Sequence, residues 1–213
     1  MSADPMGIET SVFAELPKVV GSGRGVIATE CGGRGVARIA ARSGQAARVA
    51  ELMRAQFGIE PPNGPRRASR GDVGIGGIAP QTWLATREGE GNAFAESLRS
   101  LLGDCASVAD LSDAYVILRI TGPKVRDALA RLIPIDLHPR SFEVSDVAQT
   151  VCGHIGVMLW RLEDTAQRDP AFEIWVGRSL AISLHRALSH GAAQFGFMLQ
   201  TADVPEAPEK HPA

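Results

Sequence analysis

Two spacings of hydrophobic residues alternate along the first half of the chain. Residues 35–42 (GVARIAAR) alternate at a period of two, which is typical of a strand. Residues 45–57 space their apolar positions three and four apart, which predicts one buried helix face, and Gly58 is placed to end that helix. A strand over 80–87 and a helix over 92–102 repeat this order. The two helices would bury Ala46, Val49, Ala50, Met53, Phe57, Phe94, Leu98, Leu101 and Leu102.

The second half repeats the rhythm with more strongly apolar segments. Residues 114–120 (AYVILRI) are rich in strand-forming side chains, and Pro123 then favours the start of a helix that Pro134 ends. Two further strands and a closing helix are predicted over 155–162, 172–176 and 178–194. This order predicts an α+β fold with mixed sheets, packed helices and ferredoxin-like strand–helix–strand units.

Proline and glycine suggest where the ordered domain begins and ends. We expect flexible tails over 1–15 and 201–213 and a single domain over 16–200. That domain divides into two parts, about 16–104 and 105–200. Residues 60–77 hold three prolines and five glycines, so we expect a long surface loop there.

Composition narrows the class of protein. The 213 residues are 45% hydrophobic and carry 22 basic against 24 acidic side chains, a net charge of -2, which excludes a generally basic nucleic-acid binder. The chain has no signal-peptide core and no run of 18 apolar residues, so neither secretion nor a membrane span is expected. Three scattered cysteines, at 31, 105 and 152, indicate reduced cytoplasmic thiols.

Neither the glycine-rich segments nor the histidines form a recognisable ligand motif. Glycines at 21–25, 32–35 and 74–77 do not stand between a strand and a helix as a dinucleotide fingerprint requires, so we interpret them as turns. Cys152 and His154 supply two metal ligands at most. His185 and His190 would point about 140° apart on one helix. We therefore expect no metal site and no cofactor bound by this chain.

Arginine is unevenly distributed. Nine arginines and only three acids lie between Arg24 and Arg70. Three interpretations remain open for this excess: a docking surface for a protein partner, a solvated face, or a site for an anionic ligand. The cluster Arg66, Arg67 and Arg70 is the leading interface candidate, and charge reversal there should weaken assembly while leaving the fold intact. Asp136, which follows the helix end, is either a turn residue or part of a site, and spacing favours the turn.

An ordered set of segments resembles the gamma subunit family of heterotetrameric sarcosine oxidase. The resemblance covers roughly residues 100–197 and rests on residues 110–113 (DLSD), 115–123 (YVILRITGP), 129–139 (LARLIPIDLHP), 148–150 (AQT), 155–161 (IGVMLWR) and 172–179 (FEIWVGRS). It implies a non-catalytic subunit of a cytoplasmic flavoenzyme that oxidatively demethylates sarcosine to glycine in sarcosine catabolism. It also implies alpha, beta and delta partner subunits and the fold of a truncated folate-binding aminomethyltransferase.

In that family the cofactors are held by the partners. The resemblance places FAD, FMN and NAD on alpha and beta, tetrahydrofolate on alpha and zinc on delta. Asp136 falls near the position of an acidic folate contact in the aminomethyltransferases, but this chain is much shorter and lacks most of their pocket wall. The alternatives are the equivalent subunit of an N-methylglutamate dehydrogenase, a stand-alone folate-dependent one-carbon protein and an unrelated binding module.

Overall fold

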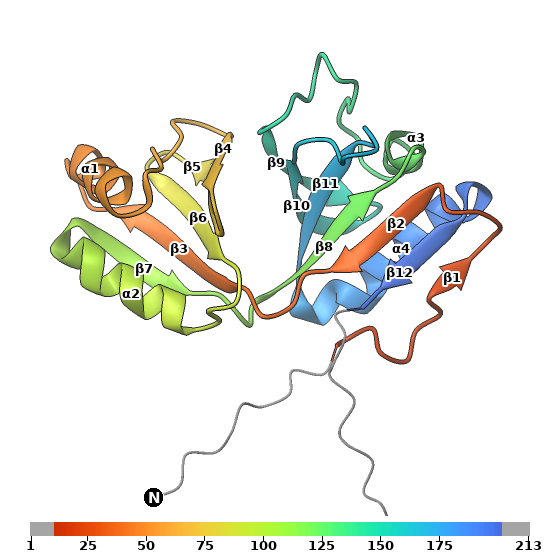
Figure 1. The fold of residues 1–213 in the computed structure, drawn as a ribbon, viewed down its shortest axis with the longest axis horizontal. Helices are drawn as coiled ribbons and strands as arrows, with labels where there is room; N and C mark the ends of the chain where they lie inside the picture. Colours follow the sequence, from red (N-terminus) through yellow and green to blue (C-terminus); the bar gives the residue numbers. More distant parts are fainter. Residues whose placement is uncertain (1–10, 202–213) are drawn as a thin grey trace, which may run out of the picture.

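Two β-sheets pack against each other, and each carries two helices on its outer side (Figure 1). The computed structural model describes residues 11–201. The five-stranded sheet and its helices comprise β3 (Gly35–Ala41), α1 (Ala46–Phe57), β4 (Arg67–Arg70), β5 (Val73–Ala79), β6 (Thr82–Arg87), α2 (Ala93–Leu102) and β7 (Ala106–Asp110). The seven-stranded sheet and its helices comprise β1 (Val19–Val20), β2 (Val26–Glu30), β8 (Tyr115–Thr121), α3 (Val125–Leu129), β9 (Val147–Cys152), β10 (Ile155–Arg161), β11 (Ala171–Gly177), α4 (Ala181–Ala192) and β12 (Phe197–Gln200). Short 3-10 helices cover Gly103–Cys105, Arg178–Leu180 and Ala193–Phe195.

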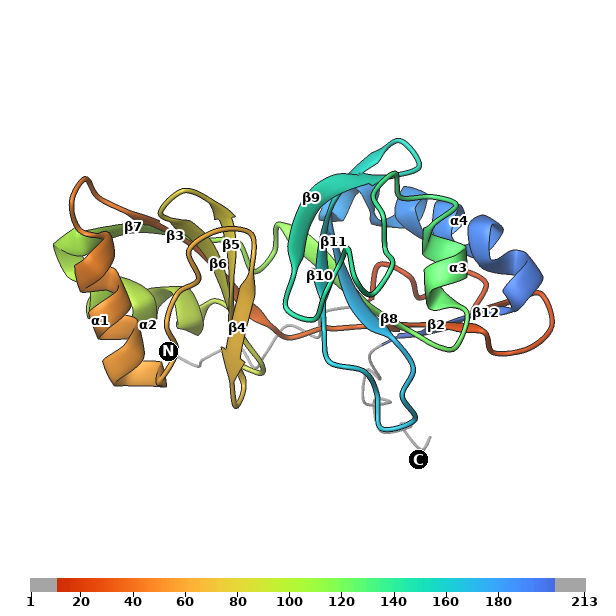
Figure 2. The same cartoon turned by 90° about the horizontal axis from the view of Figure 1, so that it is seen from above.

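The strand orders confirm the predicted α+β fold class. The smaller sheet has the order β4-β5-β6-β3-β7 with antiparallel pairing throughout. The chain passes through β3, α1, β5, β6, α2 and β7 in turn, which is a ferredoxin-like split βαβ arrangement with β4 added at one edge. In the larger sheet, β8, α3, β10, β11, α4 and β12 repeat that arrangement, and β2 is inserted between β12 and β8. Figure 2 shows the two halves side by side.

The predicted helices pack as their apolar spacing requires. Val49 and Met53 of α1 and Phe94 and Leu98 of α2 are fully buried in one core beneath the smaller sheet. Gly58 adopts a left-handed φ of 65° at the end of α1, a conformation that glycine adopts without strain. The helix predicted from Pro123 is shorter than expected. It ends at Leu129, and the chain continues through turns to Leu132, whose carbonyl accepts a hydrogen bond from the Gly153 amide at 2.7 Å.

The expectation of a long surface loop over residues 60–77 is wrong. Its second half forms the hairpin of β4 and β5, and Val73 through Gly77 are buried. The glycines serve close packing here. A Cβ atom built on Gly77 would lie 2.0 Å from the Gly64 carbonyl oxygen, and one on Gly76 would lie 2.7 Å from the Trp160 ring. Composition alone does not distinguish this use of glycine from flexibility.

The expected division at residues 104 and 105 is also wrong. β1 and β2 belong to the larger sheet although they precede the smaller one in sequence, because β2 pairs with both β8 and β12. β7, which follows residue 105, completes the smaller sheet beside β3. Phe13, inside the expected N-terminal tail, is fully buried in the core of the larger half. Residues 1–10 and 202–213 of the two expected tails lie outside the described residues.

Candidate functional site between the two sheets

Strand alternation places charged and apolar side chains side by side on the inner face of the larger sheet. Ile117 and Arg119 of β8 point to the same side, as do Glu173 and Trp175 of β11. The register pairs Arg119 with Glu173 and Ile117 with Trp175 across the two strands. The inner face therefore carries an apolar region and an adjacent charged region.

The apolar region is centred on two tryptophans. Trp160 and Trp175 are fully buried, with ring centroids 4.5 Å apart. They pack with Met158 and with Val36 and Leu84 from the smaller sheet, in a cluster that also includes Ile117 and Val147. Burial of this cluster couples the two halves, because separating the sheets would expose both indoles.

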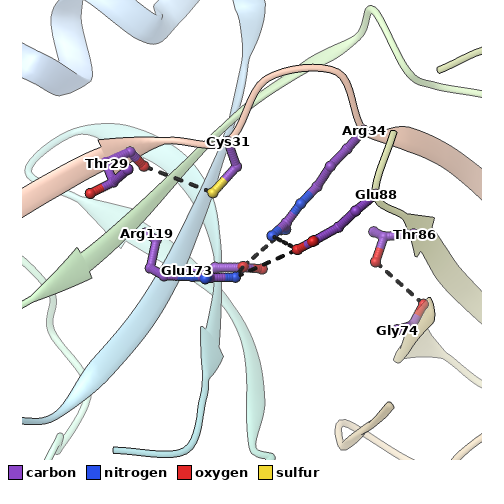
Figure 3. Close-up of polar contacts among 8 residues, drawn as sticks. All are labelled: Thr29, Cys31, Arg34, Gly74, Thr86, Glu88, Arg119 and Glu173. Carbon is purple, nitrogen blue, oxygen red and sulfur yellow. Dashed lines mark hydrogen bonds and ion pairs between the residues drawn. The ribbon is translucent and has the colours of Figure 1, made fainter. Parts of the chain in front are cut away.

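The charged region is a network around Glu173 (Figure 3). The Glu173 carboxylate accepts hydrogen bonds from Arg34 at 2.9 Å and Arg119 at 3.0 Å, and its side chain is only 2% exposed. Arg34 also pairs with Glu88 at 3.0 Å, so it ties the larger sheet to the end of β6. Burial opposes the charge on Arg34, yet Glu173 and Glu88 together hold its pKa above the usual value. These four residues, Arg34, Glu88, Arg119 and Glu173, are called the charge network below.

Cys31 lies beside the charge network without the features of a nucleophile. Its thiol donates a hydrogen bond to the Thr29 carbonyl at 3.8 Å. Burial raises its pKa, and the nearby Arg34 only partly opposes that effect. An adjoining cavity of about 50 Å³, lined by Cys31, Arg34 and Tyr115 among others, has room for a water molecule but not for a flavin or folate. Burial also raises the pKa of Cys152, to about 11, so both thiols are protonated at neutral pH.

Arg66 joins the two sheets at a second contact, where the chain enters β4 and β9. Its guanidinium pairs with Asp146 at 2.6 Å and donates to the Val144 carbonyl at 3.2 Å. Backbone hydrogen bonds run alongside, from the Arg67 amide to Ser145 and from the Val147 amide to Pro65. Charge reversal at Arg66 would therefore break a contact inside the chain, contrary to the expectation that it leaves the fold intact.

The other two arginines of the interface candidate lie apart from Arg66. Arg67 is half-buried, with its guanidinium 5.8 Å from the centre of the Trp160 ring. Arg70 is exposed and its guanidinium covers Gly58 at the end of α1. The three arginines are thus adjacent in sequence but do not form one patch, and only Arg70 is a simple candidate for a partner contact.

Asp136 organises a turn on the surface. Its carboxylate accepts hydrogen bonds from the Ser141 hydroxyl at 2.6 Å and the His138 amide at 2.9 Å. The Ser141 hydroxyl and then the His138 amide hold the pKa of this carboxyl below its usual value. Asp136 and Arg66 line an open hollow of about 400 Å³, which no residue of the charge network lines. Each oxygen of Asp136 accepts one hydrogen bond within this turn, so its observed contacts are those of the turn residue that spacing favoured.

Replacement of Asp136 by asparagine is accordingly expected to leave tetrahydrofolate affinity unchanged. The side chain keeps its size and loses a charge that serves the local turn. Isothermal calorimetry of the wild-type and D136N chains with tetrahydrofolate checks this expectation. Micromolar binding that disappears in D136N would contradict it and restore the folate interpretation.

The structure assembles no candidate metal centre from the histidines and cysteines that it describes. No group of three or more His, Cys, Asp or Glu residues in 11–201 is arranged to hold a metal ion. His185 is buried between Phe13 and Phe197, and burial lowers its pKa. Within the same residues, no helix is long and apolar enough to cross a membrane.

An apolar groove of about 500 Å³ runs along the junction of the sheets. Tyr115, Met158 and Trp175 form one wall, and Ile78 and Leu84 of the smaller half form the other. The Gln149 amide crosses it to the Ile78 carbonyl at 2.6 Å, and the neighbouring Val151 is 38% exposed. The groove adjoins the charge network through Trp175, which lies two residues from Glu173 on β11.

Sequence reasoning missed the charge network. Arg119 and Glu173 each interrupt an otherwise apolar strand segment, AYVILRI and FEIWV. A charged side chain in such a strand is normally paired, so this signal was present. The sequence pattern does not show the register between β8 and β11, and it is this register that makes Arg119 and Glu173 partners.

Comparison with known proteins identifies one family. A model of the sarcosine oxidase gamma subunit family matches residues 40–194. The gamma subunit of sarcosine oxidase from Arthrobacter sp. is 38% identical over 85 residues, 39% of this chain and 41% of that protein. Its counterpart from Corynebacterium sp. (strain U-96) is 34% identical over 92 residues, 43% of this chain and 44% of that protein. The matched segments thus span less than half the length of these relatives.

Two solved structures share the fold. Heterotetrameric sarcosine oxidase from Corynebacterium sp. U-96, in complex with pyrrole 2-carboxylate, contains a chain with a TM-score of 0.69 and 24% identity, covering 81% of this chain and 86% of that one. The glycine cleavage system aminomethyltransferase T from Bartonella henselae has a TM-score of 0.60 and 11% identity, covering 82% of this chain and 47% of that one. At these identities the likeness establishes a shared fold, which covers about half of the aminomethyltransferase chain.

Proposed function

The chain belongs to the sarcosine oxidase gamma subunit family, and on that premise we propose that it is a non-catalytic subunit that assembles and stabilises a heterotetrameric flavoenzyme. The match of the family model over residues 40–194 carries this proposal, because it includes every element of the smaller sheet except most of β3, and both walls of the apolar groove. Alpha, beta and delta subunits are the proposed partners, and the cytoplasm is the proposed location.

The proposed reaction of the complex is oxidative demethylation of sarcosine to glycine. We place FAD, FMN and NAD on the alpha and beta subunits, the one-carbon acceptor tetrahydrofolate on alpha and zinc on delta. An N-methylglutamate dehydrogenase with an equivalent subunit is the second candidate, and turnover of sarcosine against N-methylglutamate by the purified complex separates the two.

Two features of the structure support a role without chemistry of its own. Burial raises the pKa of Cys31 and Cys152, so neither thiol is poised as a nucleophile. Glu173, the most enclosed carboxylate of the charge network, is held by two arginines. We place a partner contact at the apolar groove, beside the exposed side chain of Val151.

Co-expression with the alpha, beta and delta subunits of the same genome tests the proposal. We expect size-exclusion chromatography to show one tetramer with flavin absorbance and sarcosine oxidation. The chain purified alone should be colourless and inactive, and omission of this chain should reduce the yield of soluble complex. A tetramer-sized, fully active assembly formed in equal yield without this chain would contradict the proposal.

Arg70 provides a sharper test of the docking surface. Because its guanidinium makes no ion pair with a described residue, R70E changes a surface charge without breaking a known internal bond, and it should weaken assembly while leaving the circular dichroism unchanged. R131E is the control, because Arg131 is also exposed and its side chain makes no ion pair with a described residue. Equal recovery of both variant complexes at moderate salt would exclude Arg70 from the interface.

A further inference from the structure

One edge of the larger sheet is only partly paired. β9 lies at that edge, with β10 as its neighbour in the sheet. The Val147 amide donates to the Pro65 carbonyl at 2.9 Å and therefore points away from β10. Because the backbone N–H and C=O groups of successive strand residues point to opposite sides, those of Gln149 and Val151 also point away from β10. Among the described residues, neither Gln149 nor Val151 exchanges a backbone hydrogen bond with a segment other than β10.

The smaller sheet presents a second open backbone group to the same space. Arg66 lies between β9 and β5, since it bridges to Asp146 on one side and its carbonyl accepts from the Gly77 amide at 2.9 Å on the other. The next residue of β5, Ile78, is skipped by the register between β5 and β6. Its carbonyl accepts a hydrogen bond from the Gln149 side chain at 2.6 Å. A side chain thus bonds a backbone carbonyl that strand pairing leaves open.

The apolar groove lies between these two edges, with β9 on one side and β5 on the other (Figure 1). Ile78, Gln149 and Val151 all line it, and both Gln149 and Val151 are exposed. None of the described side chains that line the groove is charged, so it suits an occupant that is apolar where it enters. Next to the groove, Pro65 and Arg66 already run between β9 and β5 and hydrogen-bond to both, as a short strand does.

We propose that an extended, apolar segment of a partner subunit enters this groove and pairs with the free edge of β9 as an added strand. The N–H and C=O groups of Gln149 and Val151 supply the main-chain hydrogen bonds, and the groove takes the segment's side chains at alternate positions. A docked helix satisfies its own backbone and would leave these edge groups unpaired, whereas an extended backbone carries donors and acceptors at the matching spacing. The inference rests on the proposed assembly function and adds the mode of contact.

Residue-resolved hydrogen exchange of the free chain and of the purified tetramer tests the added strand. We expect the amides of Gln149 and Val151 to exchange rapidly in the free chain and about tenfold more slowly in the tetramer, because hydrogen-bonded amides are protected. The Thr150 amide, which faces Val157 of β10, is the internal control and should change little. Unchanged exchange of Gln149 and Val151 in a tetramer that forms normally overturns the added strand and leaves the proposed function standing. Failure of the wild-type chain to form a tetramer overturns both.

Proline substitution tests the same hydrogen bonds. V151P removes an N–H group that β10 does not use, so the free chain should keep its circular dichroism and its urea midpoint. In competition with an equal amount of tagged wild-type chain, V151P should enter the tetramer about tenfold less often, and V151A, which keeps the N–H group, only slightly less often.

V19P is the matched control. Val19 is an exposed valine on the edge strand β1, and its N–H group also points away from its neighbour, because the adjacent Lys18 carbonyl accepts from the Leu199 amide of β12. V19P should compete as well as the wild-type chain. Equal losses for V151P and V151A would assign the contact to the side chain, and equal losses for V151P and V19P would assign it to proline itself; either result overturns the added strand. If V151P misfolds, hydrogen exchange of the wild-type tetramer decides the question.

Discussion

Replacement of Glu173 by glutamine is expected to lower the free energy of unfolding by about 3 kcal/mol, because loss of one partner leaves buried charge uncompensated. The Glu173 side chain is 2% exposed and that of Arg34 is 8% exposed, so water replaces little of the lost interaction. Glutamine has nearly the same shape and can still accept one hydrogen bond, so the loss reflects charge rather than packing. For a chain of this size, the thermal midpoint should fall by roughly 10 °C.

The matched control is E96Q. Glu96 pairs with Arg99 on the exposed face of α2, with its side chain 70% exposed, and an exposed pair of this kind contributes under about 1 kcal/mol. Urea unfolding of the wild-type, E173Q and E96Q chains gives the comparison. If E173Q and E96Q unfold at the same urea concentration, the charge network contributes nothing to the junction of the sheets.

Local pattern was sufficient to predict the four α-helices and five of the twelve strands that the structure describes, β3, β6, β8, β10 and β11. The helix over 45–57 and the strand over 155–162 were predicted close to their observed bounds, because their apolar spacing has one consistent period. Besides the β4–β5 hairpin, the strands β1, β2, β7, β9 and β12 were missed, and three of these, β2, β7 and β9, have five or six residues. β1 has only two residues and β12 only four, which is too few for periodicity to be visible in sequence.

The larger errors arose from contacts that are distant in sequence. β2 pairs with β12, about 170 residues later, and that pairing moves the N-terminal strands out of the half to which sequence order assigned them. The interface candidate shows the same effect. Arg66, Arg67 and Arg70 are neighbours in sequence, but strand alternation and the pairing of Arg66 with Asp146 send them to separate places. Of the candidate site, the charged residues within apolar strands were visible in the sequence, whereas their partners required the register.

Glycine illustrates why the segment over 60–77 was interpreted wrongly. A glycine-rich stretch can be flexible, or it can allow close approach of another part of the chain, and both have the same composition. β5 is the second kind: Gly74 lies against Arg67, and Gly76 lies against Trp160. The distinction depends on what faces the strand: a neighbouring strand's arginine at Gly74, and the Trp160 ring of the other sheet at Gly76.

Replacement of Gly76 by alanine is therefore expected to destabilise the chain by about 2–3 kcal/mol, since overpacking a filled interior typically costs 1–3 kcal/mol. The added Cβ atom would lie 2.7 Å from Cζ2 and 3.0 Å from Cε2 of Trp160. Trp160 is fully buried against Trp175 at a centroid distance of 4.5 Å, so the ring has nowhere to move. Relief of the clash requires the two sheets to separate, which would expose the apolar cluster between them.

G156A is the control that isolates this effect. Gly156 also lies in a strand, β10, and a Cβ atom there would meet nothing within 4 Å. Since alanine restricts the unfolded chain more than glycine, G156A should be neutral or stabilising by up to about 1 kcal/mol. Denaturant unfolding followed by tryptophan fluorescence measures both, because Trp160 and Trp175 report on the junction itself. A G76A chain as stable as G156A would show that β5 does not press against Trp160, and the close packing of the two sheets inferred from that contact would be wrong.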